Sequence, residues 1–124
     1  MDNEQEPAAN SFAEEFEFES AYANNSRFEP SIWDLKILFG QLCQHTGSGS
    51  MDWHTAITMP WMQAKVFAYY LSLNIAIHEM ETGKIDVHPN VLPAKLNLPE
   101  DKKNDPKAIA LNEFATRLHK EMFG

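Results

Sequence analysis

The sequence predicts an α+β fold, in which a three-stranded antiparallel sheet is followed by a long helix, a proline-rich loop and a C-terminal helix. Apolar and polar residues alternate in Trp33–Phe39 and again in Met51–Met59, as they do in half-buried strands. Directly afterwards the apolar residues take up helical spacing and occupy nearly every side of residues 60–81. The length of 124 residues suits a single domain, which we expect over residues 16–124.

The N-terminal segment differs from the rest of the chain in charge. Residues 1–20 contain seven acidic residues and no basic one, so they carry most of the net charge of -8. We expect residues 1–15 to form a disordered acidic tail, because they are also poor in branched apolar residues. A first strand is expected at about Phe18–Phe28. Alternatively, Phe12, Phe16 and Phe18 form a linear motif that docks on a partner.

Turn signals separate the other two strands. Glu29-Pro30-Ser31 is typical of a turn, and the glycine- and serine-rich residues 46–50 are typical of a hairpin tip. Gly40 either ends the second strand or makes a β-bulge. The second strand is expected to carry its apolar side on Trp33, Leu35, Ile37 and Phe39. The third is expected to carry Trp53, Thr55, Ile57 and Met59 on one side and His54, Ala56 and Thr58 on the other.

The long helix is expected from Pro60 to Glu81. Thr58 is a suitable N-cap, Pro60 suits a first turn, where its missing N–H costs nothing, and Gly83 suits a helix C-terminus. One apolar stripe consists of Met62, Val66, Tyr69, Leu73, Ala76/Ile77 and Met80. Further residues widen it well past half of the helix surface: Phe67, Tyr70, Leu71, Ile75 and His78. A short chain rarely buries such a helix by itself, so we expect an oligomer.

The C-terminal part consists of a connection and a second helix. Residues 83–105 are irregular and contain Pro89, Pro93 and Pro99. Asp105-Pro106 is a helix start signal, and the helix is expected to end near Phe123 with a single apolar stripe.

Composition excludes several classes of protein. No clustered basic face is present, so we expect no binding to nucleic acid. The longest apolar run, Val66–Leu71, is far shorter than the roughly 20 residues of a membrane helix, so we expect no membrane insertion. A single cysteine excludes an intramolecular disulfide, and no signal peptide is visible, so we expect a cytoplasmic protein.

Several short motifs between Tyr22 and Ile85 follow one another in a recognisable order. They are Tyr22-Ala23-Asn24, Asp34-Leu35-Lys36-Ile37-Leu38-Phe39-Gly40, Thr58-Met59 with Ala64-Lys65, and Asn74-Ile75 with Glu79, Gly83 and Ile85. In their order and spacing they resemble the domain of unknown function 3467 family, a group of small bacterial and archaeal proteins. His78 and Thr82 depart from that pattern. The resemblance covers about half of the chain and implies an architecture, but no activity.

Candidate catalytic or metal-binding residues are few and scattered. Asn74, His78 and Glu81 share a helix face, either as a polar seam between helices or as a ligand or proton-transfer site. Cys43 near His45 or His54 is expected to be a partly buried thiol rather than a nucleophile. The carboxylates Asp34, Asp52, Glu79 and Glu81 are expected to form solvated salt bridges. We therefore expect no catalytic residues, no metal and no cofactor.

The apolar residues favour an interaction function instead. Tyr22, Trp33, Trp53 and Trp61 are core residues, an oligomer contact or peptide groove, or the wall of a small-ligand pocket. We expect a non-enzymatic assembly module that pairs with itself, as a dimer or larger, through the Pro60–Glu81 helix, with a protein or peptide as a further partner. The interface is expected to include Val66, Tyr70, Leu73, Asn74, Ile77 and His78. The alternatives are a small-ligand-binding protein or small enzyme with a pocket around Asn74 and His78, and a chaperone-like peptide binder.

Overall fold

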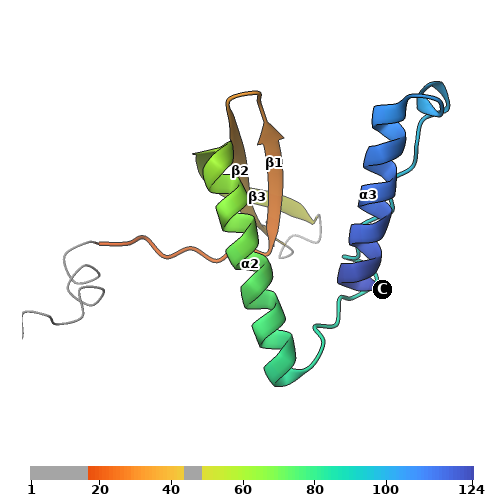
Figure 1. The fold of residues 1–124 in the computed structure, drawn as a ribbon. Coiled ribbons are helices and arrows are strands. Elements are labelled where there is room, and N and C mark those ends of the chain that lie inside the picture. The colour runs from red at the N-terminus through yellow and green to blue at the C-terminus, as the bar shows by residue number, and fades with distance from the viewer. Residues whose placement is uncertain (1–16, 44–48) are drawn as a thin grey trace, which may run out of the picture. The chain divides into compact units, whose positions relative to one another are not determined.

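The computed structural model describes residues 17–43 and 49–124. In chain order it contains the strands β1 (Asn25–Pro30), β2 (Asp34–Cys43) and β3 (Ser50–Pro60), the helix α2 (Trp61–Thr82), the short 3-10 helix η2 (Glu100–Lys102) and the helix α3 (Pro106–Phe123) (Figure 1). This order confirms the predicted α+β fold. The chain divides into two compact units between Leu73 and Asn74, within α2. The predicted acidic tail over residues 1–15 and most of the predicted hairpin tip lie outside the described residues.

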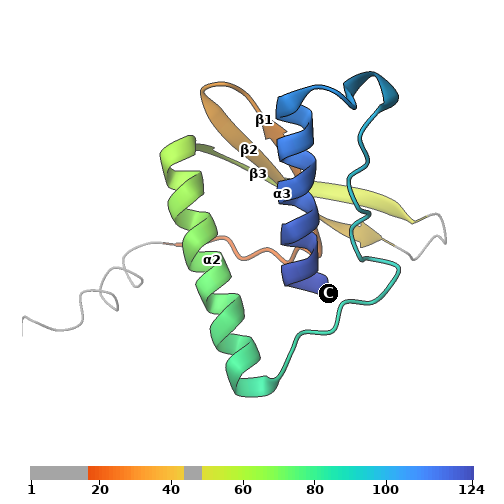
Figure 2. The same cartoon turned by 45° about the vertical axis from the view of Figure 1, so that its right-hand side comes forward.

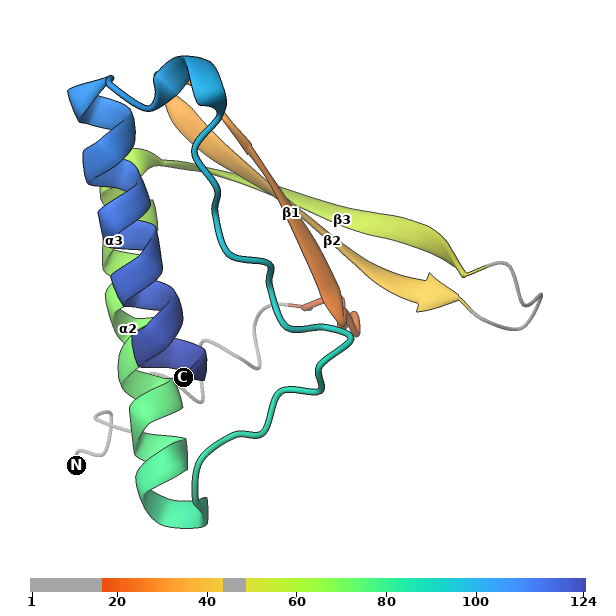
Figure 3. The ribbon, with the colours of Figure 1, turned by 90° about the vertical axis from the view of Figure 1, so that its right-hand side faces the viewer.

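The three strands form one antiparallel sheet in the order β1-β2-β3. β1 pairs with β2 from Asn25 opposite Gly40 to Pro30 opposite Leu35. β3 pairs with the whole length of β2, so the β2–β3 hairpin continues past the end of the shorter β1 (Figure 3). Residues directly opposite each other share a face of the sheet. Phe28, Ile37 and Ile57 therefore lie side by side on one face.

A β-bulge changes the alternation at Gly40, as one of the two predictions for this residue stated. Phe39 pairs with Thr55 and Gly40 pairs with Trp53, so His54 is the extra residue on β3. The side chain of Trp53 consequently lies on the opposite face from Ile57, and the prediction that these two share a face is wrong. Gly40 is required there, because a Cβ atom would lie 2.7 Å from the carbonyl oxygen of Asp52 and 2.7 Å from the Trp53 ring.

The N-terminal end of the sheet differs from the prediction. β1 begins at Asn25, whereas the first strand was expected from about Phe18. Trp33 lies in the turn before β2 and not in the strand. The reason is the Ser31 hydroxyl, which accepts hydrogen bonds from the backbone N–H groups of Trp33 (3.1 Å) and Asp34 (3.0 Å) and so closes the turn two residues later than expected.

The start of α2 lies one residue from its expected position, but Thr58 does not cap it. Thr58 pairs with Lys36, and β3 continues to Pro60, directly before the helix. The indole N–H of Trp61 donates to the carbonyl oxygen of Ser31 at 2.9 Å, which ties the first residue of α2 to the β1–β2 turn. Gly83 ends the helix as predicted, with a φ of 101° that favours glycine.

The second unit contains the irregular connection and α3, both as predicted. The connection has no regular structure apart from η2 and runs back beside α3 (Figure 2). His119 of α3 donates from Nε2 to the carbonyl oxygen of Pro93 at 2.8 Å, which joins the two segments. Asp105 caps α3, since its carboxylate accepts a hydrogen bond from the N–H of Lys107 at 3.0 Å.

Candidate functional site

An apolar groove of about 370 Å³ lies between the sheet and the first half of α2. Its helix side consists of four residues at the spacing of one helical face, hereafter the inner stripe: Ala64, Phe67, Ala68 and Leu71. Its sheet side includes Phe28, Leu35, Ile37, Phe39 and Met59. Ile37 is 4% exposed and is the only buried apolar side chain among the described residues. The described residues therefore close the groove only in part.

A second apolar stripe follows the opposite side of α2. Three of the inner-stripe residues, Ala64, Phe67 and Leu71, are each followed two positions later by an apolar residue. A residue two positions later lies about 200° further around a helix. The resulting outer stripe consists of Met62, Val66, Tyr69, Leu73, Ala76 and Met80. All six are exposed, Met62 at 80% and Met80 at 85%. The outer stripe thus faces away from the groove and from the sheet that lines it.

Polar residues occupy the two flanks between the stripes. One flank carries Lys65, Ser72 and Glu79, and the other carries Gln63, Asn74 and Glu81. Tyr70 and Ile77, both exposed, widen the outer stripe on the second flank. A helix that is apolar on two opposite sides and polar between them suits a position between two apolar layers. The sheet is one such layer.

The four aromatic candidates lie at two ends of the sheet. Trp33 and Trp61 lie at the end where Asp34 pairs with Pro60. Trp53 packs over Gly40, six residues further along β2, or roughly 20 Å away. Tyr22 lies near Trp53, because its carbonyl oxygen binds the ring of His54. Trp33 is 79% exposed and Tyr22 is 67% exposed, so neither belongs to the core that the described residues of one copy form.

The polar candidates on α2 have structural partners. Nε2 of His78 lies 3.1 Å from the Thr82 hydroxyl, which itself donates to the His78 carbonyl oxygen at 2.8 Å. The hydroxyl therefore accepts from His78. The carboxylate of Glu79 accepts a hydrogen bond from the N–H of Ile85 at 3.0 Å and so holds the chain that leaves α2. Asn74 and His78 are both exposed on the helix surface.

The remaining candidates for chemistry are apart from one another. Asp34 and Asp52 belong to opposite ends of the β2–β3 ladder, where they pair with Pro60 and Gln41. Asp34 accepts from the Ser31 hydroxyl at 3.0 Å. Cys43 is half-buried at the end of β2, and His45 lies outside the described residues. Among the residues that the structure describes, no group of three or more His, Cys, Asp or Glu side chains is arranged to hold a metal ion.

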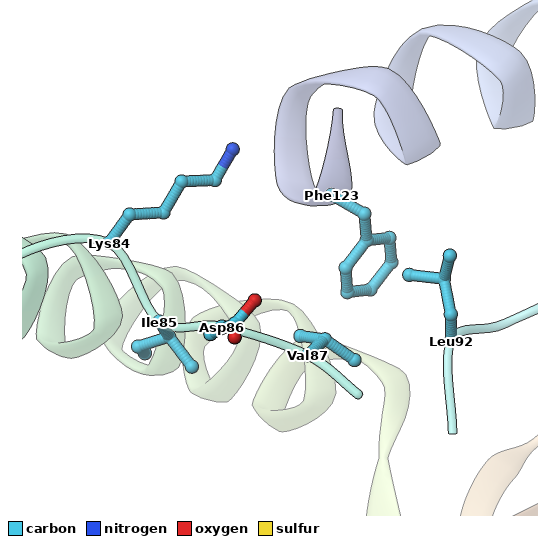
Figure 4. Close-up of a pocket in the computed structure, with 6 residues that line it drawn as sticks. All are labelled: Lys84, Ile85, Asp86, Val87, Leu92 and Phe123. Carbon is cyan, nitrogen blue, oxygen red and sulfur yellow. The ribbon is translucent and has the colours of Figure 1, made fainter. Parts of the chain in front are cut away.

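The second unit contains a shallow pocket of its own, with a volume of about 370 Å³ (Figure 4). The chain that leaves α2 contributes Lys84, Ile85, Asp86 and Val87, and the wall is completed by Leu92 and by Phe123 of α3. One cation and one anion among apolar side chains define no particular ligand chemistry. The pocket lies between the end of α3 and the connection.

Sequence reasoning missed the polar contacts that hold the start of the sheet. The Asn24 carboxamide oxygen accepts from the N–H of Leu42 at 3.1 Å, and the N–H of Asn24 donates to the carbonyl oxygen of Gly40 at 3.0 Å. His54, the bulge residue, donates from Nε2 to the carbonyl oxygen of Tyr22 at 2.9 Å. Because a carbonyl can only accept, Nε2 carries the proton. The signal that could have found this contact is the bulge at Gly40, which frees His54 from the regular alternation.

Comparisons with known proteins give no relative for this fold and surface. No family model matches the chain, and searches of the curated proteins and of the solved structures found no match. The resemblance to the domain of unknown function 3467 family therefore stays a prediction. In the described part of the chain, neither α2 nor α3 has the length and hydropathy that a bilayer-spanning helix requires.

Proposed function

We propose that this protein is a non-enzymatic assembly module whose α2 helix pairs with α2 of a second copy. The observation that carries the proposal is the outer stripe, which presents six apolar residues to solvent on the side of α2 opposite the sheet. Exposed apolar patches of this kind mark interaction surfaces in soluble proteins. A second copy offers an identical stripe, which makes a self-complementary contact with closed symmetry the simplest cover.

The small core supports the same proposal. A domain of about 100 residues normally buries well over half of the surface that its unfolded chain exposes. In the described residues, Ile37 is the one buried apolar side chain, and the large apolar residues of α2 are exposed apart from the half-buried Ile75. Each apolar side chain that becomes fully buried contributes about 1.5–3 kcal/mol. Pairing through the outer stripe therefore supplies stability that one copy lacks.

The size of the contact sets a requirement for the flanks. From Met62 to Met80 the outer stripe is about 27 Å long, at 1.5 Å per residue. A seam between two helices of this length covers less than the about 800 Å² that each partner usually buries in a stable complex. The exposed Tyr70 and Ile77, which adjoin the stripe, are therefore expected to be covered as well.

The test compares two neighbouring substitutions on α2. Leu73→Asp places a charge in the centre of the outer stripe, and its burial in both copies is expected to raise the dissociation constant of the dimer by at least about 100-fold. Asn74→Asp introduces the same charge one residue later. The sequence pattern predicted Asn74 in the interface, but the residue lies on the polar flank with Gln63 and Glu81, so this variant is expected to leave the dimer intact. Light scattering after size-exclusion chromatography measures the mass of each variant.

Circular dichroism shows whether the helix of each variant has formed. Val66→Asp, one heptad earlier on the same stripe, serves as the second variant if Leu73→Asp does not fold. The proposal is contradicted if Leu73→Asp and Val66→Asp remain folded dimers. It is also contradicted if Leu73→Asp and Asn74→Asp dissociate to the same extent.

A further inference from the structure

The outer stripe has the residue spacing of a two-helix seam. Its six members, from Met62 to Met80, are separated alternately by four and three residues. This is the a/d spacing of a coiled coil, in which each apolar residue inserts between residues of a facing helix. The inner stripe lies on the side of α2 that such a seam leaves free. One helix can therefore contact its own sheet and a second α2 at the same time.

The residues that precede the a positions, known as g positions, differ in charge along the helix. Lys65 precedes Val66, Ser72 precedes Leu73, and Glu79 precedes Met80. In an antiparallel pair, the g residues of one helix face the g residues of the other. Lys65 then lies opposite Glu79 of the second copy, twice by symmetry, and Ser72 lies opposite its own copy beside the two-fold axis.

A parallel pair gives a poorer match. In that arrangement each g residue faces the residue five positions later in the partner. Lys65 would meet Tyr70 and Ser72 would meet Ile77. The counterpart of Glu79 would be Lys84, which lies outside α2, because the helix ends at Thr82. The apolar layers would also stack Tyr69 on Tyr69 and Ala76 on Ala76, whereas an antiparallel pair sets Tyr69 against Leu73 and Ala76 against Val66. Charge and size thus favour the antiparallel arrangement.

Among the described residues of one copy, neither Lys65 nor Glu79 has an ion-pair partner. The ion pairs among the described residues are Arg27–Glu29, Lys36–Glu29 and Lys103–Glu100. Glu79 uses Oε2 for the Ile85 N–H, which leaves Oε1 for a cation. Lys65 and Glu79 of the same helix are 14 residues apart, or about 21 Å, which is beyond any direct contact.

We infer that two copies of this chain pair through antiparallel α2 helices, with Lys65 of each copy bound to Glu79 of the other. The inference rests on the proposed function and adds the direction and register of the pair. The orientation test uses Cys43→Ala chains that carry either Met62→Cys or Met80→Cys. These are mixed and treated with a short bismaleimide, and the linked peptides are mapped by mass spectrometry.

Links between position 62 and position 80 of different chains are expected, because the antiparallel register brings them together. Links of position 62 to itself would mean a parallel pair, which overturns the inference and leaves the proposed function standing. If the Cys43→Ala chain is a dimer but forms neither of these links, the contact between copies lies elsewhere. That result contradicts both the inferred orientation and the proposed function. If the Cys43→Ala chain and the unmodified protein are both monomers, the proposed function itself is contradicted.

The register test exchanges the two charges. Lys65→Glu and Glu79→Lys are each expected to raise the dissociation constant by about tenfold, since each replaces two attractions with two repulsions. The double variant Lys65→Glu/Glu79→Lys is expected to return to within about threefold of the unmodified protein. Because the two residues cannot meet within one helix, this recovery requires contact between copies.

Two controls exclude other causes. If net charge alone governed pairing of this acidic chain, Lys65→Glu and Glu79→Lys would change the dissociation constant in opposite directions. Glu81→Lys reverses a charge outside the seam and is expected to leave the dissociation constant within about twofold. A double variant that pairs more weakly than both single variants overturns the inferred register.

Discussion

The two apolar stripes of α2 have similar composition but different surroundings. The inner stripe faces the sheet, where its two alanines, Ala64 and Ala68, line the groove together with Ile37 and its neighbours. The outer stripe has long, flexible methionines at both ends, and its six residues are exposed. The difference suggests that the inner stripe fixes the fold of one copy and that the outer stripe serves the contact between copies. Substitutions on the two sides should therefore change different quantities.

On the sheet side, Ile37→Ala is expected to have the larger effect on folding. It removes the one buried apolar side chain of the described residues, and its half-exposed neighbours can partly fill the space. We therefore expect a loss of about 2–3 kcal/mol in the free energy of unfolding, at the lower end for such a truncation. The thermal midpoint should fall by roughly 10 °C or more.

The comparison with the outer stripe makes this prediction specific. At temperatures where Ile37→Ala remains folded, its dissociation constant should stay within about threefold of the unmodified value. Sedimentation equilibrium at low temperature measures that constant. A variant that dissociates as strongly as Leu73→Asp would show that the two sides of α2 are not separate in function.

A smaller effect is expected from Asn24→Ala, at the edge of the sheet. The substitution removes the acceptor of the Leu42 N–H, in an exposed contact that water can partly replace. The free energy of unfolding should fall by about 0.5–1.5 kcal/mol. Chemical denaturation at fixed protein concentration measures this, and Asn104→Ala, at an exposed asparagine of the connection, is the matched control. Equal losses in the two variants would mean that the Asn24 contact contributes nothing specific.

Much of the fold followed from local patterns. Alternation of apolar residues predicted two strands, and the Asp105-Pro106 and Gly83 signals predicted helix ends that the structure has at those residues. Local patterns failed where a single polar contact decided the geometry. The Ser31 hydroxyl moved Trp33 into a turn, and the extra residue His54 moved Trp53 to the other face of the sheet.

The candidate surface was only partly predictable. The residues of the outer stripe were recognised from helical spacing, but a sequence does not show which side of an apolar helix its own sheet covers. That depends on the direction in which α2 leaves β3 and on the bond between Trp61 and Ser31. Once the groove assigns Phe67 and Leu71 to the sheet, the heptad spacing of the opposite side becomes recognisable as a separate feature.

The mass of the unmodified protein in solution tests the central claim most directly. Sedimentation velocity over a range from about 1 to 100 μM distinguishes one copy of 14.2 kDa from a pair. We expect a dimer at the upper concentrations, with dissociation on dilution governed by the outer stripe. A single copy of 14.2 kDa over the whole range would contradict the account. Protection of Met62 and Met80 from oxidation in that copy would show that the chain covers its own outer stripe.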